Sequence, residues 1–507
     1  MALKRNQQIF LREETTEGAP FANVTDVVNS TYGKFRAIDP TIEFEPQKIE
    51  RSIAQGTLTP SLGISGQKLA TMRFGLEITG NGTAYANGVA QFDLPLRACG
   101  FRREVLSKCL IGAITVADKF IHGEQVIVSG TPATIIGVVV KNTYDGEPAL
   151  YLARQNGLGT TVSITSGTIL EGLSSGAKAT LSADSTQQAA FGYWPVSYSL
   201  SKLDVQTCTS ALAVGDIIQG ATSGAVAVVD VAQTASPASP VSLYVRMIGG
   251  TFGDAETVAR VSPTAGAIGL TDASNAESQF TNPTIAGAVT KDGVYEAASN
   301  MRGNVTIRLP VGDLPVMQFE LKGAYLGHED GSNITGISYP QLVPAPVLAA
   351  AFKIGANNAA DTGDFVSPCV ATIEIQTGNE LTQRQCMNSD AGVYAYEITA
   401  RSATCTLDPE LQPEAFFPVM SKFLDNETVC MEVRVQPVLE ADRDGRTFII
   451  QIPCAGISAS TTTDRNGRLV RSLTLAPNTG SSSTSTPAHD NDIVIIHDLA
   501  VDTSTGV

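Results

Sequence analysis

The chain of 507 residues carries a formal net charge of −16, and its length predicts more than one compact unit. Its 46 glycines, 25 prolines and 17% charged residues favour strands and turns over helices, and the acidic balance argues against binding DNA through basic patches. The sequence has no apolar run of about 18 residues, so we expect no membrane span. It also has no signal-peptide pattern, so we expect synthesis in a cytoplasm. Its eight cysteines form no Cys-x-x-Cys pair, which predicts reduced, mostly buried thiols.

The first part of the chain, residues 1–115, shows the apolar alternation of half-buried strands, as in Met72, Phe74, Leu76 and Ile78. Phe35 to Gly66 is polar and interrupted by prolines, so it poorly suits a central strand. Long ordered segments without their own core usually contact a partner. We therefore expect an arm here, with Ile42, Phe44 and Ile49 as apolar anchors. Glu104 to Leu110 is predicted as a short helix.

Residues 116–290 differ in texture, because aromatic residues thin out and Ala, Gly, Ser, Thr and Val dominate. A repeat lies here: the segment starting at Gly215 resembles the one starting at Gly167, and looser copies begin at Gly123 and Gly253. Each copy is an apolar segment, a Gly-rich turn and a second apolar segment, which predicts a hairpin. We expect an inserted tandem pair of small β-modules.

Residues 291–507 return to strand alternation, and Leu314–Lys322 echoes Leu69–Glu77 in the pattern Leu-x-x-Met-x-Phe-x-Leu. Both duplication of the flanking domain and convergent strand chemistry explain this echo. Pro413 to Leu424 is the best candidate for a longer helix, although Pro418 limits its regularity. The whole pattern predicts a mainly β protein, with a β-sandwich or barrel and one flanking short helix.

Motifs for catalysis are weak. Gly172-Leu-Ser174-Ser-Gly176 fits the Gly-x-Ser-x-Gly pattern of a hydrolase, but that serine needs a strand–turn–helix context. The equivalent place in the second copy is Thr222, and strand-like sequence follows, so we predict a structural turn. The four histidines lack metal-site spacing, and no phosphate loop, calcium loop or acid–base pair is complete. We therefore predict no enzyme activity, no cofactor and no metal site.

Several segments resemble the tail tube (major tail) proteins of long, flexible-tailed bacteriophages and related prophages. The resemblance covers roughly residues 5–110 and 290–500, in order and spacing. Its most distinctive segment is Leu96-Arg-Ala-Cys-Gly-Phe101. The other segments are Glu13–Pro20, Ala37–Gly66, Met72–Gly82, Asp292–Tyr295, Met301–Leu309, Gly312–Gly323, Glu397–Arg401, Asp408–Pro409, Gly445–Pro453, Asp464–Arg468 and His489–Ile493.

The resemblance implies tail-tube β-sandwich sequence in residues 1–115 and 291–507, with the 116–290 modules outside the tube. Residues 291–507 either complete the first sandwich or form a second one. Rings would be trimeric with pseudo-sixfold symmetry, slightly favoured over hexameric, and would stack axially through arms. Other tail proteins, such as the tape measure, tail terminator and distal tail proteins, would be partners. The protein would reside in the virion, after synthesis in the host bacterial cytoplasm, without contacting a membrane.

The acidic balance suggests a conduit whose wall repels DNA, so that the genome passes through without specific binding. Glu77, Glu320 and Glu374 alternate with apolar neighbours and are the candidates for lumen-facing acids. The alternatives are another phage virion β-protein, such as a capsid decoration or adhesin-like tail protein, and a carbohydrate-active tail enzyme. Trp194 is the only tryptophan, and aromatic residues make up 6%, which disfavours the enzyme.

Overall fold

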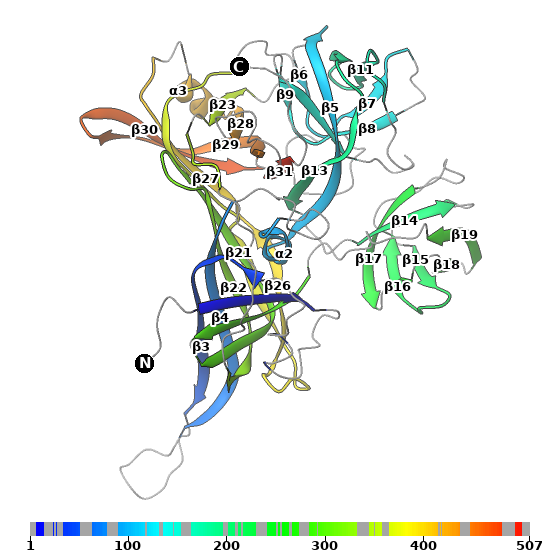
Figure 1. The fold of residues 1–507 in the computed structure, drawn as a ribbon, viewed down its shortest axis with the longest axis vertical. Coiled ribbons are helices and arrows are strands. Elements are labelled where there is room, and N and C mark those ends of the chain that lie inside the picture. The colour runs from blue at the N-terminus through cyan, green and yellow to red at the C-terminus, as the bar shows by residue number, and fades with distance from the viewer. Residues whose placement is uncertain are drawn as a thin grey trace, which may run out of the picture. The chain divides into compact units, whose positions relative to one another are not determined.

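The computed structural model is mainly β, with 67% of the described residues in strands and 4% in helices, as predicted. The chain divides into two compact units. Figure 1 labels their helices and strands. Unit 1 contains Met1–Gly100, Pro283–Val347 and Thr372–Cys405, and unit 2 contains Phe101–Asn282, Leu348–Ala371 and Thr406–Val507. The structure describes residues 7–498 except 15–23, 25–26, 28–33, 51–62, 79–89, 117–118, 131–134, 145–146, 154–163, 196–200, 208–210, 214–215, 230–240, 250–251, 254–255, 263–265, 273–282, 292, 332–343, 349, 357–364, 414–415, 417, 437–446 and 479–491.

Unit 1 is built on one antiparallel sheet. Its order is β2 (Lys34–Phe35), β1 (Gln7–Glu13), β20 (Ile285–Lys291), β21 (Val294–Pro310), β22 (Val316–Asp330), β4 (Ile64–Glu77) and β3 (Ala37–Ile49). β24 (Val370–Gln376) pairs with the end of β21 at Thr306–Pro310. Helix α2 (Asp93–Ala98) packs beside β1, β20 and β21, and the hairpin of β25 (Asn379–Gln385) and β26 (Val393–Arg401) packs beside β21 and β22.

The apolar alternation lines the core of this sheet. Met72, Phe74 and Leu76 are all buried, and the rings of Phe74 and Phe319 stack with centroids 5.3 Å apart. The two echoing segments are neighbouring strands, with Met72 opposite Leu321 and Leu76 opposite Met317. Their shared pattern is what two adjacent strands over one core require.

Unit 2 contains two small barrels of the same topology. In barrel one, a closed circuit of pairings runs through β5 (Phe101–Thr115), β10 (Ala149–Ala153), β8 (Ile135–Val139), β7 (Gln125–Val128), β11 (Ile169–Gly172) and β12 (Lys178–Leu181), and back to β5. The corresponding circuit of barrel two is β14 (Ser201–Thr207), β17 (Val241–Gly249), β16 (Val226–Val229), β15 (Ile217–Gly220), β18 (Thr257–Ser262) and β19 (Gly266–Asp272). The small pair β6 (Lys119–Phe120) and β9 (Thr143–Tyr144) lies between β5 and β10 in sequence.

The remaining strands of unit 2 join barrel one. β13 (Thr186–Pro195) pairs with β5 on one side and with β31 (Val494–Asp498) on the other. From β31 the sheet continues through β29 (Thr447–Arg465), β28 (Thr428–Val435) and β23 (Ala351–Ala356), while β30 (Arg468–Pro477) forms a hairpin with β29 and also pairs with β27 (Thr404–Pro409). Helix α3 (Val419–Leu424) packs beside β29.

Two predicted helices differ from the structure. Glu104 to Leu110 is not helical but lies within β5, because pairing with β13 and β10 on its two sides overrides the local pattern. The helix predicted over Pro413 to Leu424 is confirmed only as α3, which begins after Pro418. A proline lacks the backbone N–H that a helix interior needs, so it sits at the helix start.

A carboxylate caps one hairpin turn in each barrel. In barrel one, Glu124 accepts hydrogen bonds from the backbone N–H groups of Ser174 and Ser175 and from the Ser175 hydroxyl. In barrel two, Glu256 accepts the same set from Thr222 and Ser223. The predicted turn at Gly172–Gly176 is therefore confirmed: it joins two strands, without the helix that a hydrolase serine would require.

A buried ion cluster links barrel one to the C-terminal strands. The Lys141 Nζ, which is fully buried, lies 2.8 Å from a carboxylate oxygen of Glu432 and 3.5 Å from one of Glu147. Glu147 also contacts Lys353, at 3.0 Å, and Arg434. These cations outweigh the effect of burial and hold the pKa of Glu147 well below its usual range.

Candidate assembly surfaces

Segments that carry the family resemblance meet around helix α2 in unit 1. Arg97 of the Leu96–Phe101 segment is buried, and its two terminal nitrogens each lie 3.0 Å from an oxygen of Glu13 at the end of β1. This bidentate geometry is the strongest that arginine and a carboxylate form. It fixes the helix against the N-terminal strand.

A second set of contacts ties the same segments to β21. The side-chain amide of Asn379 donates to the backbone carbonyls of Cys99 and Gly303, at 2.8 Å each. A methyl group at Gly303 would lie 2.0 Å from the carbonyl oxygen of Glu320, so glycine is required where β21 and β22 approach. Residues far apart in the sequence are thereby held in one place.

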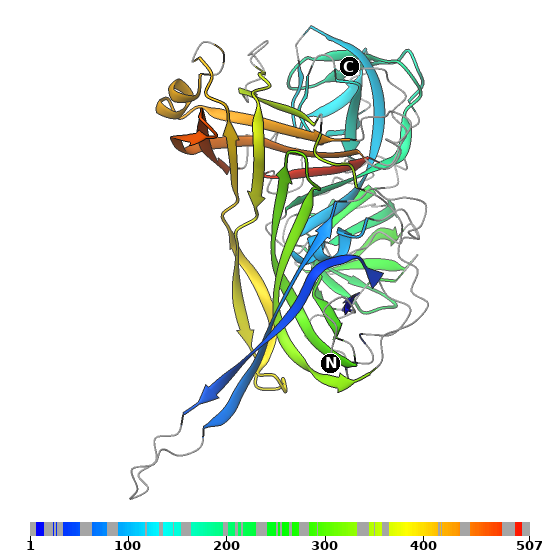
Figure 2. The ribbon, with the colours of Figure 1, turned by 60° about the vertical axis from the view of Figure 1, so that its left-hand side comes forward.

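The predicted arm forms the long β3–β4 hairpin, which Figure 2 shows in blue. Among the described strands, β3 pairs only with β4 and is an edge strand; residues 51–62 of the arm lie outside the description. Ile42 is buried, whereas Phe44 is 45% exposed and Ile49 is 56% exposed. The Phe44 ring lies 4.4 Å, between centroids, from that of Tyr325. Ile64, opposite Ile49, is also exposed.

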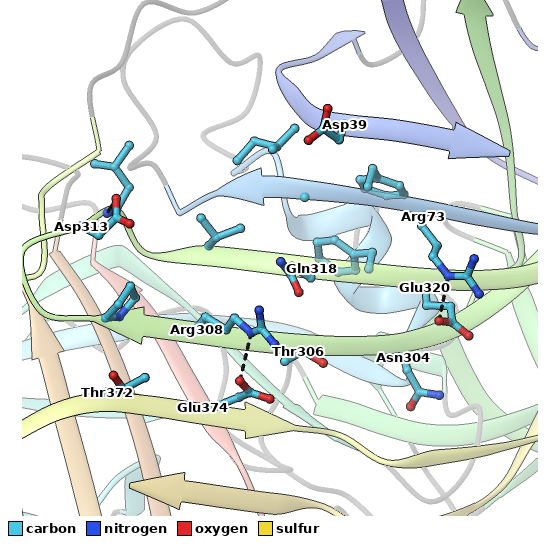
Figure 3. A pocket seen from close by; sticks show the side chains of 17 residues that line it. Asp39, Arg73, Asn304, Thr306, Arg308, Asp313, Gln318, Glu320, Thr372 and Glu374 are labelled. Atoms are coloured by element: carbon cyan, nitrogen blue, oxygen red, sulfur yellow. Dashed lines mark hydrogen bonds and ion pairs between the residues drawn. The ribbon is translucent and has the colours of Figure 1, made fainter. Parts of the chain in front are cut away.

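The three predicted lumen acids lie on the polar face of the unit 1 sheet, where they alternate with buried residues. Glu320 and Glu374 line an open hollow of about 960 Å³, together with Arg73 and Arg308 (Figure 3). Glu77 is half-buried at the end of β4, opposite Val316, and does not line this hollow.

The acids of the hollow are paired across strands, which the sequence does not predict. The Nε atoms of Arg73 and Arg308 lie 3.0 Å from oxygens of Glu320 and Glu374, respectively. Arg73 also pairs with Glu43 of β3. Hydrogen bonds to Glu320 and Glu43 raise the pKa of Arg73. Alternation places Arg73 on the polar face, but only the register of β3, β4 and β22 shows which acids it meets.

The described part of the chain contains no cluster of three or more metal-ligating side chains and no helix that could cross a membrane. Seven cysteines are free thiols, and Cys208 lies outside the description. Burial raises the pKa of Cys109 and of Cys430 to about 12, so neither thiol is activated as a nucleophile. Their environment is that of packing residues.

In comparisons with known proteins, no protein-family model matches the chain, and no curated protein matches its sequence.

Proposed function

We propose that the protein is the structural subunit of a bacteriophage tail tube, which assembles into stacked rings and forms the conduit for genome ejection. The segments that resemble the tail tube family support this proposal, because several of them are joined by the Arg97–Glu13 pair and by Asn379. These contacts hold the segments of the resemblance together in unit 1.

The observation that carries the proposal is the β3–β4 hairpin. An edge strand offers unpaired backbone groups, and proteins usually cover such an edge or place charges along it. Here the hairpin also exposes Phe44, Ile49 and Ile64, which a neighbouring copy would remove from water. A chain that stacks on copies of itself has a use for this feature; a monomeric protein would be prone to aggregate through it.

In this proposal, rings of three or six copies stack through the hairpin, with Ile42 in its core and with Phe44 and Ile49 against the next ring. The polar face with Glu77, Glu320 and Glu374 lines the lumen, and the two barrels, whose strands lie between Phe101 and Asp272, lie outside. Tape measure, tail terminator and distal tail proteins are the proposed partners in the virion.

Negative-stain microscopy of the purified protein tests the proposal, since it should show rings or hollow tubes of uniform width.

Ile49→Asp should abolish stacking, because it places a charge in an apolar contact, while the unfolding midpoint stays that of the wild type. Gln47→Asp, at an exposed position on the same strand, is the matched control and should stack. A wild-type protein that stays monomeric at every concentration would refute the tube. Tubes formed equally well by Ile49→Asp would exclude the hairpin as the stacking contact.

A further inference from the structure

The hollow on the polar face of unit 1 contains arginines, although the face is proposed to let DNA slide past. Its charged lining residues are Arg73, Arg308, Asp39, Asp313, Glu320 and Glu374. Arginine is the side chain best suited to bind phosphate in a bidentate manner. Two such residues in one hollow would ordinarily favour binding of a nucleic-acid backbone.

Each arginine, however, is already engaged by a carboxylate from a neighbouring strand. Arg73 lies between Glu43 of β3 and Glu320 of β22, and Arg308 of β21 pairs with Glu374 of β24. The dashed lines in Figure 3 mark the Arg73–Glu320 and Arg308–Glu374 pairs. Their side chains are between 24% and 54% exposed, and ion pairs this exposed contribute little to stability. Their main effect is therefore on the electrostatic potential of the face.

We propose that Glu43, Glu320 and Glu374 cage Arg73 and Arg308, so that duplex DNA meets a face without an arginine available to its phosphates. This inference rests on the proposed function and explains how its conduit avoids adhesion. A phosphate would have to displace a carboxylate that is held on the same sheet at high effective concentration. The surrounding carboxylates also repel the DNA phosphates. Because the paired arginines do not neutralise phosphates, DNA binding gains little from counterion release.

The test is the triple variant Glu43→Gln/Glu320→Gln/Glu374→Gln, compared with a triple control, Glu50→Gln/Glu380→Gln/Asp390→Asn. The control removes the same charge from exposed positions that do not line the hollow. Binding of duplex DNA is measured by fluorescence anisotropy, both with unassembled protein and with assembled tubes. The first measurement is made at about 0.01 M salt, where the screening length is about 30 Å.

We expect the cage variant to bind DNA, and the wild type and the control to bind weakly or not at all. With two arginines released, log K should fall with log salt with a slope of about −1.8, since each phosphate contact contributes about −0.9. This corresponds to a roughly tenfold loss of affinity between about 50 and 200 mM salt. Glu374→Gln alone, which releases only Arg308, should show about half that slope and serves if the triple variant is unstable.

Equal binding by the cage variant and the control would overturn the inference, because charge and not caging would then set the affinity. So would the absence of binding by a folded cage variant. Both results leave the tube proposal intact as long as the wild type forms tubes. Failure of the wild type to form tubes, with DNA binding gained by the cage variant, would instead refute the tube and retain the cage.

Discussion

The two barrels of unit 2 have the same strand order but different surroundings. In barrel one, the inner residues of β5 and β10 form the barrel core, while Leu106 and Tyr151 pack outward against Trp194, Ile449 and Ile496. The buried apolar cluster of barrel two comes from its own segment of the chain and consists of Leu203, Leu212, Ile218, Ala225, Ala227, Val229, Leu243, Val245, Phe252 and Val258.

Barrel one is thus joined to a larger sheet through β5, whereas the described strands of barrel two pair only with one another. The repeat in the sequence predicts two similar modules but carries no information about what each of them is joined to. The difference arises from the strands that follow barrel one, because β13 pairs with β5 and continues the sheet to β31. Barrel two has no such pairing among the described strands.

The largest expected effect is the difference between deleting barrel two alone and deleting a longer segment that also removes most of barrel one. Replacing residues 197–282 with Gly/Ser bridges of several lengths should leave the rest folded, because the described strands of barrel two pair only with one another. Replacing 116–289 should abolish folding, because it removes β13 and most of β20, which lies between β1 and β21. Solubility and circular dichroism give the readout. Soluble, folded protein after the longer deletion would show that barrel one is as separable as barrel two.

The next effect concerns the ion cluster of barrel one. Glu147→Ala leaves Lys141 and Arg434 with one fewer buried partner, and breaking a buried ion pair in this way costs about 3–5 kcal/mol. Asp216→Ala is the counterpart in barrel two, where Arg260 is 25% exposed and can be solvated, so its cost should be smaller. Urea unfolding measures both. Equal losses would mean that the buried cluster is no more important than a surface pair.

Smaller effects should follow from Gly172→Ala and Gly220→Ala, each of which adds a methyl group close to the carboxylate that caps the turn. At Gly172 it would lie 2.6 Å from both oxygens of Glu124, and at Gly220 it would collide with Glu256. Each Gly→Ala substitution should therefore cost about 1–3 kcal/mol through overpacking. Gly172→Ala should lower the main unfolding transition, whereas Gly220→Ala should affect only a separate transition of barrel two. Limited proteolysis at rising urea concentration distinguishes the two transitions.

The smallest effect is a pH dependence of opposite sign in the two caps. Burial raises the pKa of Glu124 despite its hydrogen bonds, so its contribution to stability falls as the pH rises from about 4.3, the unfolded value, through the folded pKa. For Glu256, desolvation is outweighed by hydrogen bonds from Ser223, Gly253 and Thr222, which lower its pKa. Its contribution is present above about 4.3 and is lost as the pH falls through the folded pKa. Unfolding midpoints are measured across this pH range for the wild type, Glu124→Gln and Glu256→Gln. As the pH rises, the loss caused by Glu124→Gln should become smaller, and the loss caused by Glu256→Gln should become larger.

The sequence predicts the local pattern of the fold well, because alternation reports which side chains leave water. Along β28, Met431, Val433 and Val435 alternate with other residues and are all buried, as such alternation predicts. The same pattern suggests solvent for Glu432, which is nevertheless buried at 3% exposure because Lys141 reaches it from barrel one. Such partners are set by contacts between distant segments, and no local pattern contains them.

For the candidate surfaces too, the local sequence pattern predicts which segments are involved but not which residues they contact. Prolines and polar residues indicate the β3–β4 hairpin, and alternation puts Glu320 and Glu374 on a polar face. The pairing of these acids with Arg73 and Arg308 depends on strand register, which the sequence alone does not provide.

The pairing of β1 with β20 has a consequence for how the protein is made. Gln7 lies opposite Lys291, and Tyr193 of β13 lies opposite Ile495 near the end of the chain. Contacts between residues so distant in sequence slow folding, because a long loop must close before they form. During synthesis the barrel two strands are complete long before β31 emerges, so barrel two can fold before the sheet that contains β31. Until β31 is synthesised, the edge of β13 that pairs with it stays open, and the nascent chain can aggregate through this edge.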